Sequence, residues 1–233
     1  MLKVKQFRYG TDNFGYLIYG TESAVAVDGG AVEGMLAFLR EHRLTLRYIT
    51  NTHDHQDHTI GNEALLAATH ARLLRGSELR DGAVVALDGR DIRIIHTPGH
   101  TEDSRCFHAD KALLAGDTLF NGTIGNCFSG DIEAFYNSIL KLMALPDETV
   151  IYAGHDYVKS SLAFAKRLEP GNRAVGAFLR RYNPKHVFST MADERKINPY
   201  LRFNEPGFID LMAKLRLPRD TEWDRWQSLM SIE

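Results

Sequence analysis

The sequence predicts a mixed α and β protein whose last third is helical, and two observations carry this prediction. Short alternating or apolar runs typical of strands recur as far as about residue 153, separated by stretches with apolar residues at helical spacing. From about Val158 no strand pattern is evident, and Pro170, Pro184 and Pro199 break the remaining chain into helical segments. Periodicity alone gives the α and β class and no arrangement of layers.

The individual elements follow from local pattern, in chain order. Strands are expected near residues 2–8, 13–19, 23–28, 46–50, 71–75, 83–87, 91–96, 104–108, 111–115 and 149–153. Helices are expected at about 31–43, from near His58 to Thr69, and at 131–144, 158–169, 171–182 and 204–216. The first helix has a partial apolar stripe that includes Met35 and Leu39, and the third is capped by Asp131.

The composition is that of an ordinary globular protein. Of 233 residues, 25% are charged and 44% are hydrophobic, and the formal net charge is −2. This balance gives no basic surface for nucleic acid, and no apolar run reaches the roughly 18 residues of a membrane span. The N-terminus alternates like a strand and does not resemble a signal peptide, and Cys106 and Cys127 offer no disulfide framework. We expect a cytoplasmic protein that binds neither nucleic acid nor membrane; the oligomeric state is unknown.

The segment from Thr52 to His58 is the strongest chemical signal. It places His53, His55, Asp57 and His58 in an H-x-H-x-D-H pattern just after a predicted strand. Imidazole and carboxylate are ligands for Zn, Fe and Mn. In an extended chain His53 and His55 point to one side, whereas the adjacent Asp57 and His58 cannot share that direction. The pattern therefore predicts two ligands for one metal and two for a neighbouring metal. A polar loop would explain only one or two of these histidines.

Three further ligand-type residues follow predicted strands. Asp117 and His155 each come just past a short apolar run, and His100 lies in a turn that Pro98 and Gly99 make rigid and tight. Each residue alone is readily explained as a buried histidine or a turn aspartate. Their recurrence at strand ends, in a chain that holds the H-x-H-x-D-H pattern, favours a shared metal site.

These motifs resemble those of the metallo-β-lactamase superfamily, and within it the glyoxalase II (hydroxyacylglutathione hydrolase) branch. The resemblance rests on THDHQDH, HTPGHT, GDTLF and GHDY, which begin at residues 52, 96, 116 and 154. The later elements EPGN, NPYLR and PRD point to glyoxalase II and away from a lactamase. The resemblance implies a four-layer αβ/βα sandwich. It further implies a metal-binding catalytic domain over residues 1–157 and a small helical substrate-binding domain over residues 158–233.

The resemblance also implies a ligand set. The implied ligands are His53, His55 and His100 for the first metal, Asp57, His58 and His155 for the second, and Asp117 as a bridge between them. The cofactors are then two divalent metal ions, with Zn favoured and Fe or Mn as alternatives. His96, the first residue of HTPGHT, is not a ligand in the family and is expected to be structural.

Such a site predicts hydrolysis of a small-molecule thioester. Two metals can hold a bridging water and lower its pKa towards 7, so that the resulting hydroxide attacks a carbonyl carbon. A metal then stabilises the developing oxyanion, and a thioester suits the site because thiolate is a good leaving group. Asp57 and Asp117 are the candidate catalytic residues, and Asp57 is also a candidate proton acceptor.

Three residues are candidate substrate contacts. Glyoxalase II enzymes carry a Lys and a Tyr in the loop after GDTLF, where this chain has Asn126 and Phe128; the Tyr after the GH-acid motif is kept as Tyr157. The family's basic pair before the PRD element falls near Ile209 and Met212. Loss of these contacts predicts weak binding of glutathione, or another thiol as carrier. Three basic residues nearby in the sequence are candidates to replace this pair as carrier contacts, although each also fits a solvated helix face: Arg202, Lys214 and Arg216.

Three other functions are compatible with the fold. A persulfide dioxygenase-like enzyme would hold a single iron through His53, His100 and Asp117. The complete second ligand set and the helical tail argue against it. A nucleic-acid processing member of the superfamily is disfavoured by the near-neutral charge, and a ligand-binding protein without catalysis is disfavoured by the intact ligand set. The sequence does not identify the acyl group, the thiol or the native metal.

Overall fold

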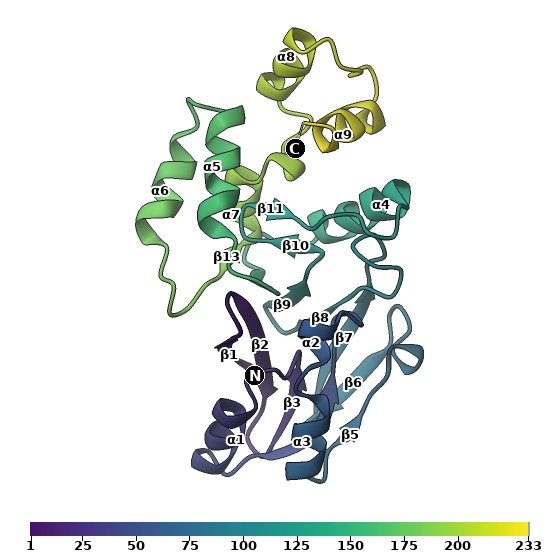
Figure 1. Cartoon of the computed structure of the whole chain (residues 1–233), viewed down its shortest axis with the longest axis vertical. Coiled ribbons are helices and arrows are strands. Elements are labelled where there is room, and N and C mark those ends of the chain that lie inside the picture. The colour runs from purple at the N-terminus through teal and green to yellow at the C-terminus, as the bar shows by residue number, and fades with distance from the viewer. Residues whose placement is uncertain (233) are drawn as a thin grey trace.

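The structure, a computed structural model, describes residues 1–232 and contains two main sheets (Figure 1). The first has the order β1-β2-β3-β4-β5. Its strands are β1 (Lys3–Tyr9), β2 (Asn13–Tyr19), β3 (Ser23–Val27), β4 (Thr45–Thr50) and β5 (Arg72–Leu73). The second has the order β13-β12-β9-β8-β7-β6. Its strands are β6 (Val84–Leu87), β7 (Arg90–His96), β8 (Arg105–Ala109), β9 (Ala112–Gly116), β12 (Val150–Ala153) and β13 (Ser189–Thr190).

Alternation along the strands sorts the buried side chains into layers. Tyr16 and Ile18 of β2 share a core with Ile94 and Phe107 of the second sheet. Leu17, which lies between them in sequence, points to the opposite face of its sheet and joins a separate core. A third core covers the outer face of the second sheet. The expected four-layer sandwich of helix, sheet, sheet and helix is therefore confirmed.

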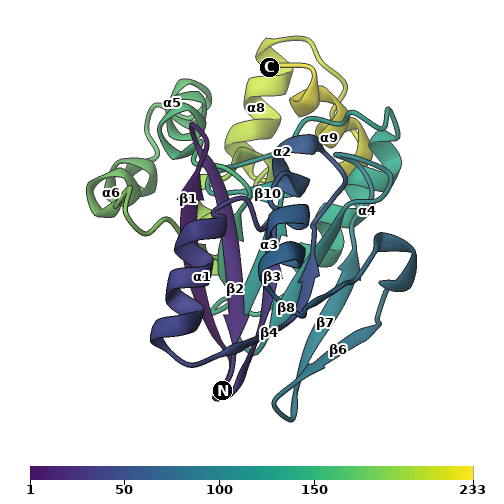
Figure 2. The ribbon, with the colours of Figure 1, turned by 60° about the horizontal axis from the view of Figure 1, so that its bottom comes forward.

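Helices cover the outer faces of both sheets. Figure 2 shows α1 (Val32–Glu41) and α3 (Asn62–Ala68) over the first sheet, and α4 (Ile132–Met143) packs on the second. The expected single helix from near His58 to Thr69 is wrong, because α2 (Gln56–Thr59) is separate from α3. At the break, a Cβ on Gly61 would lie 2.1 Å from the carbonyl oxygen of Gly29, so the close approach requires glycine, a poor residue for a helix interior.

After Val158 the described chain is mostly helical. Its helices are α5 (Val158–Leu168), α6 (Arg173–Arg181), α7 (Met191–Ile197), α8 (Pro206–Lys214) and α9 (Glu222–Met230), with a short 3₁₀ helix at Pro199–Leu201. Another 3₁₀ helix, Gly76–Glu78, lies earlier in the chain, between β5 and β6. The sequence did not predict α7, α9 or the two-residue strand β13, which pairs antiparallel with β12. Trp226 of α9 shares a core with Phe135 of α4, so this segment packs against the rest of the chain. None of the helices in residues 1–232 is both long and apolar enough to span a bilayer.

A small hairpin connects the second sheet to α4. It consists of β10 (Leu119–Phe120) and β11 (Thr123–Ile124), which pair antiparallel. The start of β2 reaches the loop after β12, where Phe14 donates its backbone N–H to the carbonyl oxygen of Gly154 at 2.7 Å. The two sheets are thus joined at the edge where β9 and β12 end.

Candidate metal centre

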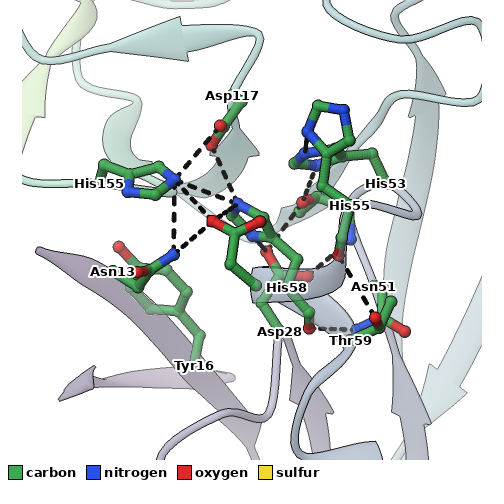
Figure 3. A network of polar contacts seen from close by, with 12 residues as sticks. Asn13, Tyr16, Asp28, Asn51, His53, His55, His58, Thr59, Asp117 and His155 are labelled. Carbon is green, nitrogen blue, oxygen red and sulfur yellow. Dashed lines mark hydrogen bonds and ion pairs between the residues drawn. The ribbon is translucent and has the colours of Figure 1, made fainter. Parts of the chain in front are cut away.

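The candidate ligands lie at this edge, because strands of both sheets end there (Figure 3). β4 leads into the segment that carries His53 to His58. β9 and β12 are parallel neighbours, so Asp117 and His155, which follow them, lie side by side. His100 comes from the turn between β7 and β8. Residues far apart in the sequence therefore meet where these strands end.

Among the described residues, three groups of side chains could each hold a metal ion, because the ligand atoms within each group all lie within 4.8 Å of one another. The groups are His53, His55 and His100; Asp57, His58 and His155; and His53, His58 and Asp117. The first two are the sets that the resemblance implies. Asp117 lies between them, with its carboxylate oxygens 3.5 Å from Nε2 of His58 and 3.6 Å from Nε2 of His100. The structure thus brings together every residue predicted as a ligand.

Each of these imidazole rings has one inner nitrogen, which faces the other ligands, and one outer nitrogen, which faces away from them. Nδ1 of His55 lies 2.9 Å from Nε2 of His53 and 3.2 Å from Nε2 of His100. The outer nitrogen of His100 donates to the carbonyl oxygen of Asn126 at 2.9 Å, and that of His155 lies 2.9 Å from Asp12. A neutral ring that donates through its outer nitrogen presents a lone pair on the inner one. Converging lone pairs at this spacing fit a metal cation.

Two further observations support this fit. Oδ1 of Asp117 is buried and has no hydrogen-bond partner in residues 1–232. Gly154 allows this carboxylate to approach, because a Cβ there would lie 2.0 Å from Oδ1. An unsatisfied buried carboxylate oxygen is costly unless it coordinates a cation.

Burial and charge set the protonation of the ligands. Burial lowers the pKa of His53 to about 4 and also lowers that of His100, so both rings are neutral at pH 7. Burial acts in the same direction on His58, but the carboxylates of Asp28 and Asp117 outweigh it and raise the pKa to about 11. Burial would raise the pKa of Asp117, yet the adjacent imidazole rings of His155 and His58 hold it well below its ordinary value. The carboxylates that favour a proton on His58 favour a metal ion at the same position.

Several residues that orient the ligands were missed by the sequence reasoning. Asp28 accepts hydrogen bonds from the backbone N–H and the hydroxyl of Thr52, both at 2.8 Å, and lies 3.0 Å from Nδ1 of His58. Asn13 donates to Oδ2 of Asp57 at 2.8 Å, and Asp12 is bonded to His155. Asp28 ends an apolar strand, which is the signal that identified Asp117, and that signal could have found it.

A pocket of about 310 Å³ adjoins the ligands. Among the residues that line it are Phe120, Ile124, Asn126, Tyr157, Phe164 and Arg167. The ring of Tyr157 stacks on that of His155, with centroids 5.0 Å apart. Two of the three candidate substrate contacts, Asn126 and Tyr157, thus belong to the pocket. The third, Phe128, lies outside it: its side chain is 66% exposed and its ring centroid is 5.2 Å from that of His100.

Known proteins resemble this chain over most of its length. The family model of the metallo-beta-lactamase superfamily matches residues 9–83 and 72–155, and that of the hydroxyacylglutathione hydrolase C-terminus matches residues 156–226. A hydroxyacylglutathione hydrolase from Nitrosococcus oceani is 37% identical over 227 residues, covering 88% of this chain and 85% of that protein. One from Pseudoalteromonas translucida is 34% identical over 232 residues, covering 92% and 90%. The crystal structure of ETHE1 from Myxococcus xanthus matches with a TM-score of 0.69 and 26% identity, covering 97% and 99%.

Proposed function

This chain belongs to the metallo-beta-lactamase superfamily and, within it, to the hydroxyacylglutathione hydrolase (glyoxalase II) family, and on that premise we propose that it hydrolyses a thioester of a small thiol with two divalent metal ions. The observation that carries the proposal is the convergence of two ligand groups on either side of one buried carboxylate, Asp117. This arrangement suits a pair of metals that share a bridging ligand. When bound, such a pair lowers the pKa of a water molecule and polarises a carbonyl oxygen.

The candidate ligands have distinct proposed roles in metal binding and proton transfer. In this proposal His53, His55 and His100 would hold one metal, Asp57, His58 and His155 would hold the other, and Asp117 would be a ligand of both. Asp57 is the proposed proton acceptor. Its side chain is about half exposed, at 48%, and one oxygen lies 3.4 Å from Nε2 of His155, so a proton taken there can pass to solvent.

The identity of the metals and the compartment belong to the same proposal. The ligand groups contain nitrogen and oxygen and no thiolate, which suits Zn and also Fe or Mn.

The compartment we propose is the cytoplasm, and the two free cysteines, Cys106 and Cys127, support a reducing environment.

The proposed division into a catalytic domain over residues 1–157 and a substrate-binding domain over residues 158–233 is supported by the walls of the pocket. Asn126 and Tyr157 contribute from the first part, whereas Ser160, Phe164 and Arg167 of α5 contribute from the second. The proposed metal ligands all come from the first part. The second part would thus bind the substrate and leave the chemistry to the first.

A panel of thioesters, assayed together with metal content and oxygen uptake, tests the proposal. We expect thioester hydrolysis without oxygen consumption, loss of the activity after chelation, and its recovery when Zn is restored. One iron per chain, with oxygen consumed on a persulfide substrate and no thioester turnover, would replace the proposal by the mononuclear iron alternative.

A further inference from the structure

We infer that Arg167 binds an anionic group at the far end of the thiol carrier, and so selects carriers that have a carboxylate or a phosphate remote from the thioester. The inference rests on the proposed thioester hydrolysis and deepens it. It assigns a specificity-determining residue on α5 that none of the sequence motifs contains.

The position of the pocket makes it the place where the carrier would lie. On one side, the carbonyl oxygen of Asn126 accepts a hydrogen bond from His100, a member of the first ligand group. On the other side, Tyr157 stacks on His155, a member of the second. A thioester held at the ligands therefore has the pocket next to it, and one of its two arms extends into the pocket.

The lining of the pocket suits an arm that is apolar along its length and charged at its end. Phe120, Ile124 and Phe164 supply apolar surface, and Asn126 and Ser160 supply polar groups. No acidic residue is among the described residues that line it, and Arg167 is the one lining residue with a formal charge. Pockets of this kind fix a ligand's orientation through a few polar groups.

The guanidinium of Arg167 is oriented but not neutralised. Its central carbon lies 4.9 Å from the ring centroid of Phe164, a stacking contact that leaves the N–H donors free. In residues 1–232 it has no hydrogen bond or ion pair. Arg202 is the contrast: it donates two hydrogen bonds to the carboxylate of Glu169, at 2.8 and 3.1 Å. A guanidinium with five unoccupied donors at a pocket is suited to a planar carboxylate or to a phosphate.

The basic residues that the sequence offered as carrier contacts do not take this role. Arg202 is occupied by Glu169. Lys214, the last residue of α8, and Arg216, two residues further on, lie outside the lining of the pocket. Met212, near the position of the family's basic pair, is fully buried in the core under α4. Arg167 is thus the cation that the fold places where the carrier would end.

The test compares three thioesters that share the lactoyl group. The carrier in S-lactoylglutathione has carboxylates, the carrier in lactoyl-CoA has phosphates, and the carrier in S-lactoyl-N-acetylcysteamine has no charge. For the charged carrier that the enzyme uses, Arg167→Met should raise KM by roughly ten- to a hundredfold, as expected for a lost charge-assisted contact, with kcat within about twofold. Arg167→Lys should restore part of the effect. The neutral thioester should be unaffected, and Lys214→Met serves as the matched control. The charged substrate that responds identifies the anion as carboxylate or phosphate.

Equal KM changes for all three thioesters, or no change for either charged one, would overturn the inference. Binding of S-methylglutathione and of free CoA, measured by calorimetry, tests the role of Arg167 separately from the proposed hydrolysis. Wild-type protein that hydrolyses no thioester would defeat the proposed function. Wild type and Arg167→Met that bind both charged probes equally would defeat the role of Arg167.

Discussion

The metal centre and the pocket beside it are built in opposite ways. In the centre, His53, His58 and His100 are buried, and each has its outer nitrogen within hydrogen-bond distance of a fixed partner. In the pocket, Arg167 is exposed and has no polar partner in residues 1–232, and Tyr157 is about one-third exposed, at 36%. The centre is therefore organised before any ligand binds, whereas the pocket leaves the guanidinium of Arg167 for the substrate. Changes in the centre should abolish chemistry, and changes in the pocket should alter only which substrate is used.

The largest effect is expected from Asp117→Ala. Loss of the carboxylate between the two ligand groups should lower kcat by at least about a thousandfold, because charge stabilisation worth several kcal/mol is removed. The fold should survive, since Asp117 follows β9 in a loop. Thermal unfolding followed by circular dichroism and a thioester assay check both points. Asp54→Ala, in the loop with the histidines but in no ligand group, is the control and should stay active. A folded Asp117→Ala variant with near wild-type turnover and metal content would refute the bridging role.

Asp28→Asn tests whether a residue that hydrogen-bonds to a proposed ligand contributes to metal affinity. Asparagine tolerates the positive φ of 52° at this position but cannot accept the hydrogen bond from His58 through its amide nitrogen. Metal affinity should fall about ten- to a hundredfold, as measured by competition with a chelator. Asp88→Asn is the matched control, because Asp88 also has a positive φ, of 49°, and accepts from two backbone N–H groups elsewhere. Equal affinities for wild type and Asp28→Asn would contradict the role given to Asp28.

The double change Asn126→Lys, Phe128→Tyr tests whether residues at and beside the pocket determine which substrate binds. It restores the residues that glyoxalase II enzymes carry at these positions. KM for S-lactoylglutathione should fall at least about tenfold, and kcat should change less, because remote contacts that act equally in the ground and transition states affect binding. The neutral N-acetylcysteamine thioester should show no change. A wild-type KM for S-lactoylglutathione already in the low micromolar range would contradict the argument.

The last effect concerns stability near the pocket and not activity. Glu194 of α7 accepts hydrogen bonds from the backbone N–H of Gly122, which joins β10 to β11, and from Asn198. Burial raises its pKa from 4.5 to about 7. The folded state then binds a proton more tightly than the unfolded state, so this group's contribution to stability falls as pH rises from about 4.5 through 7.

Glu194→Gln should remove that pH dependence. Relative to the variant, the wild-type free energy of unfolding should decline by about 3 kcal/mol at most between pH 4.5 and 8. Urea unfolding at several pH values, with both proteins in the same buffers, measures the difference. A difference that is constant across this range would show that Glu194 has the same pKa in the folded and unfolded states.

The comparison also explains which features the sequence could predict. The ligands at 53–58 were predictable because coordination demands a fixed spacing, and Asp117 was predictable because it ends an apolar strand. The bond between Asp12 and His155 joins residues 143 positions apart, and no local pattern contains it. β13 has two residues, too few for any period. Arg167 has the sequence context of any arginine on a helix surface, and only the packing of α5 brings it to the pocket.

The central claim is that both ligand groups hold metal and act together in thioester hydrolysis, and a metal titration tests it most directly. Metal-free protein is titrated with Zn while the hydrolysis rate and the bound metal are measured in the same samples. We predict that the rate reaches its plateau at about two equivalents per chain, that His155→Ala retains about one, and that His96→Ala, outside the ligand groups, behaves as wild type. Full activity at one equivalent, unaffected by the loss of His155, would contradict the account.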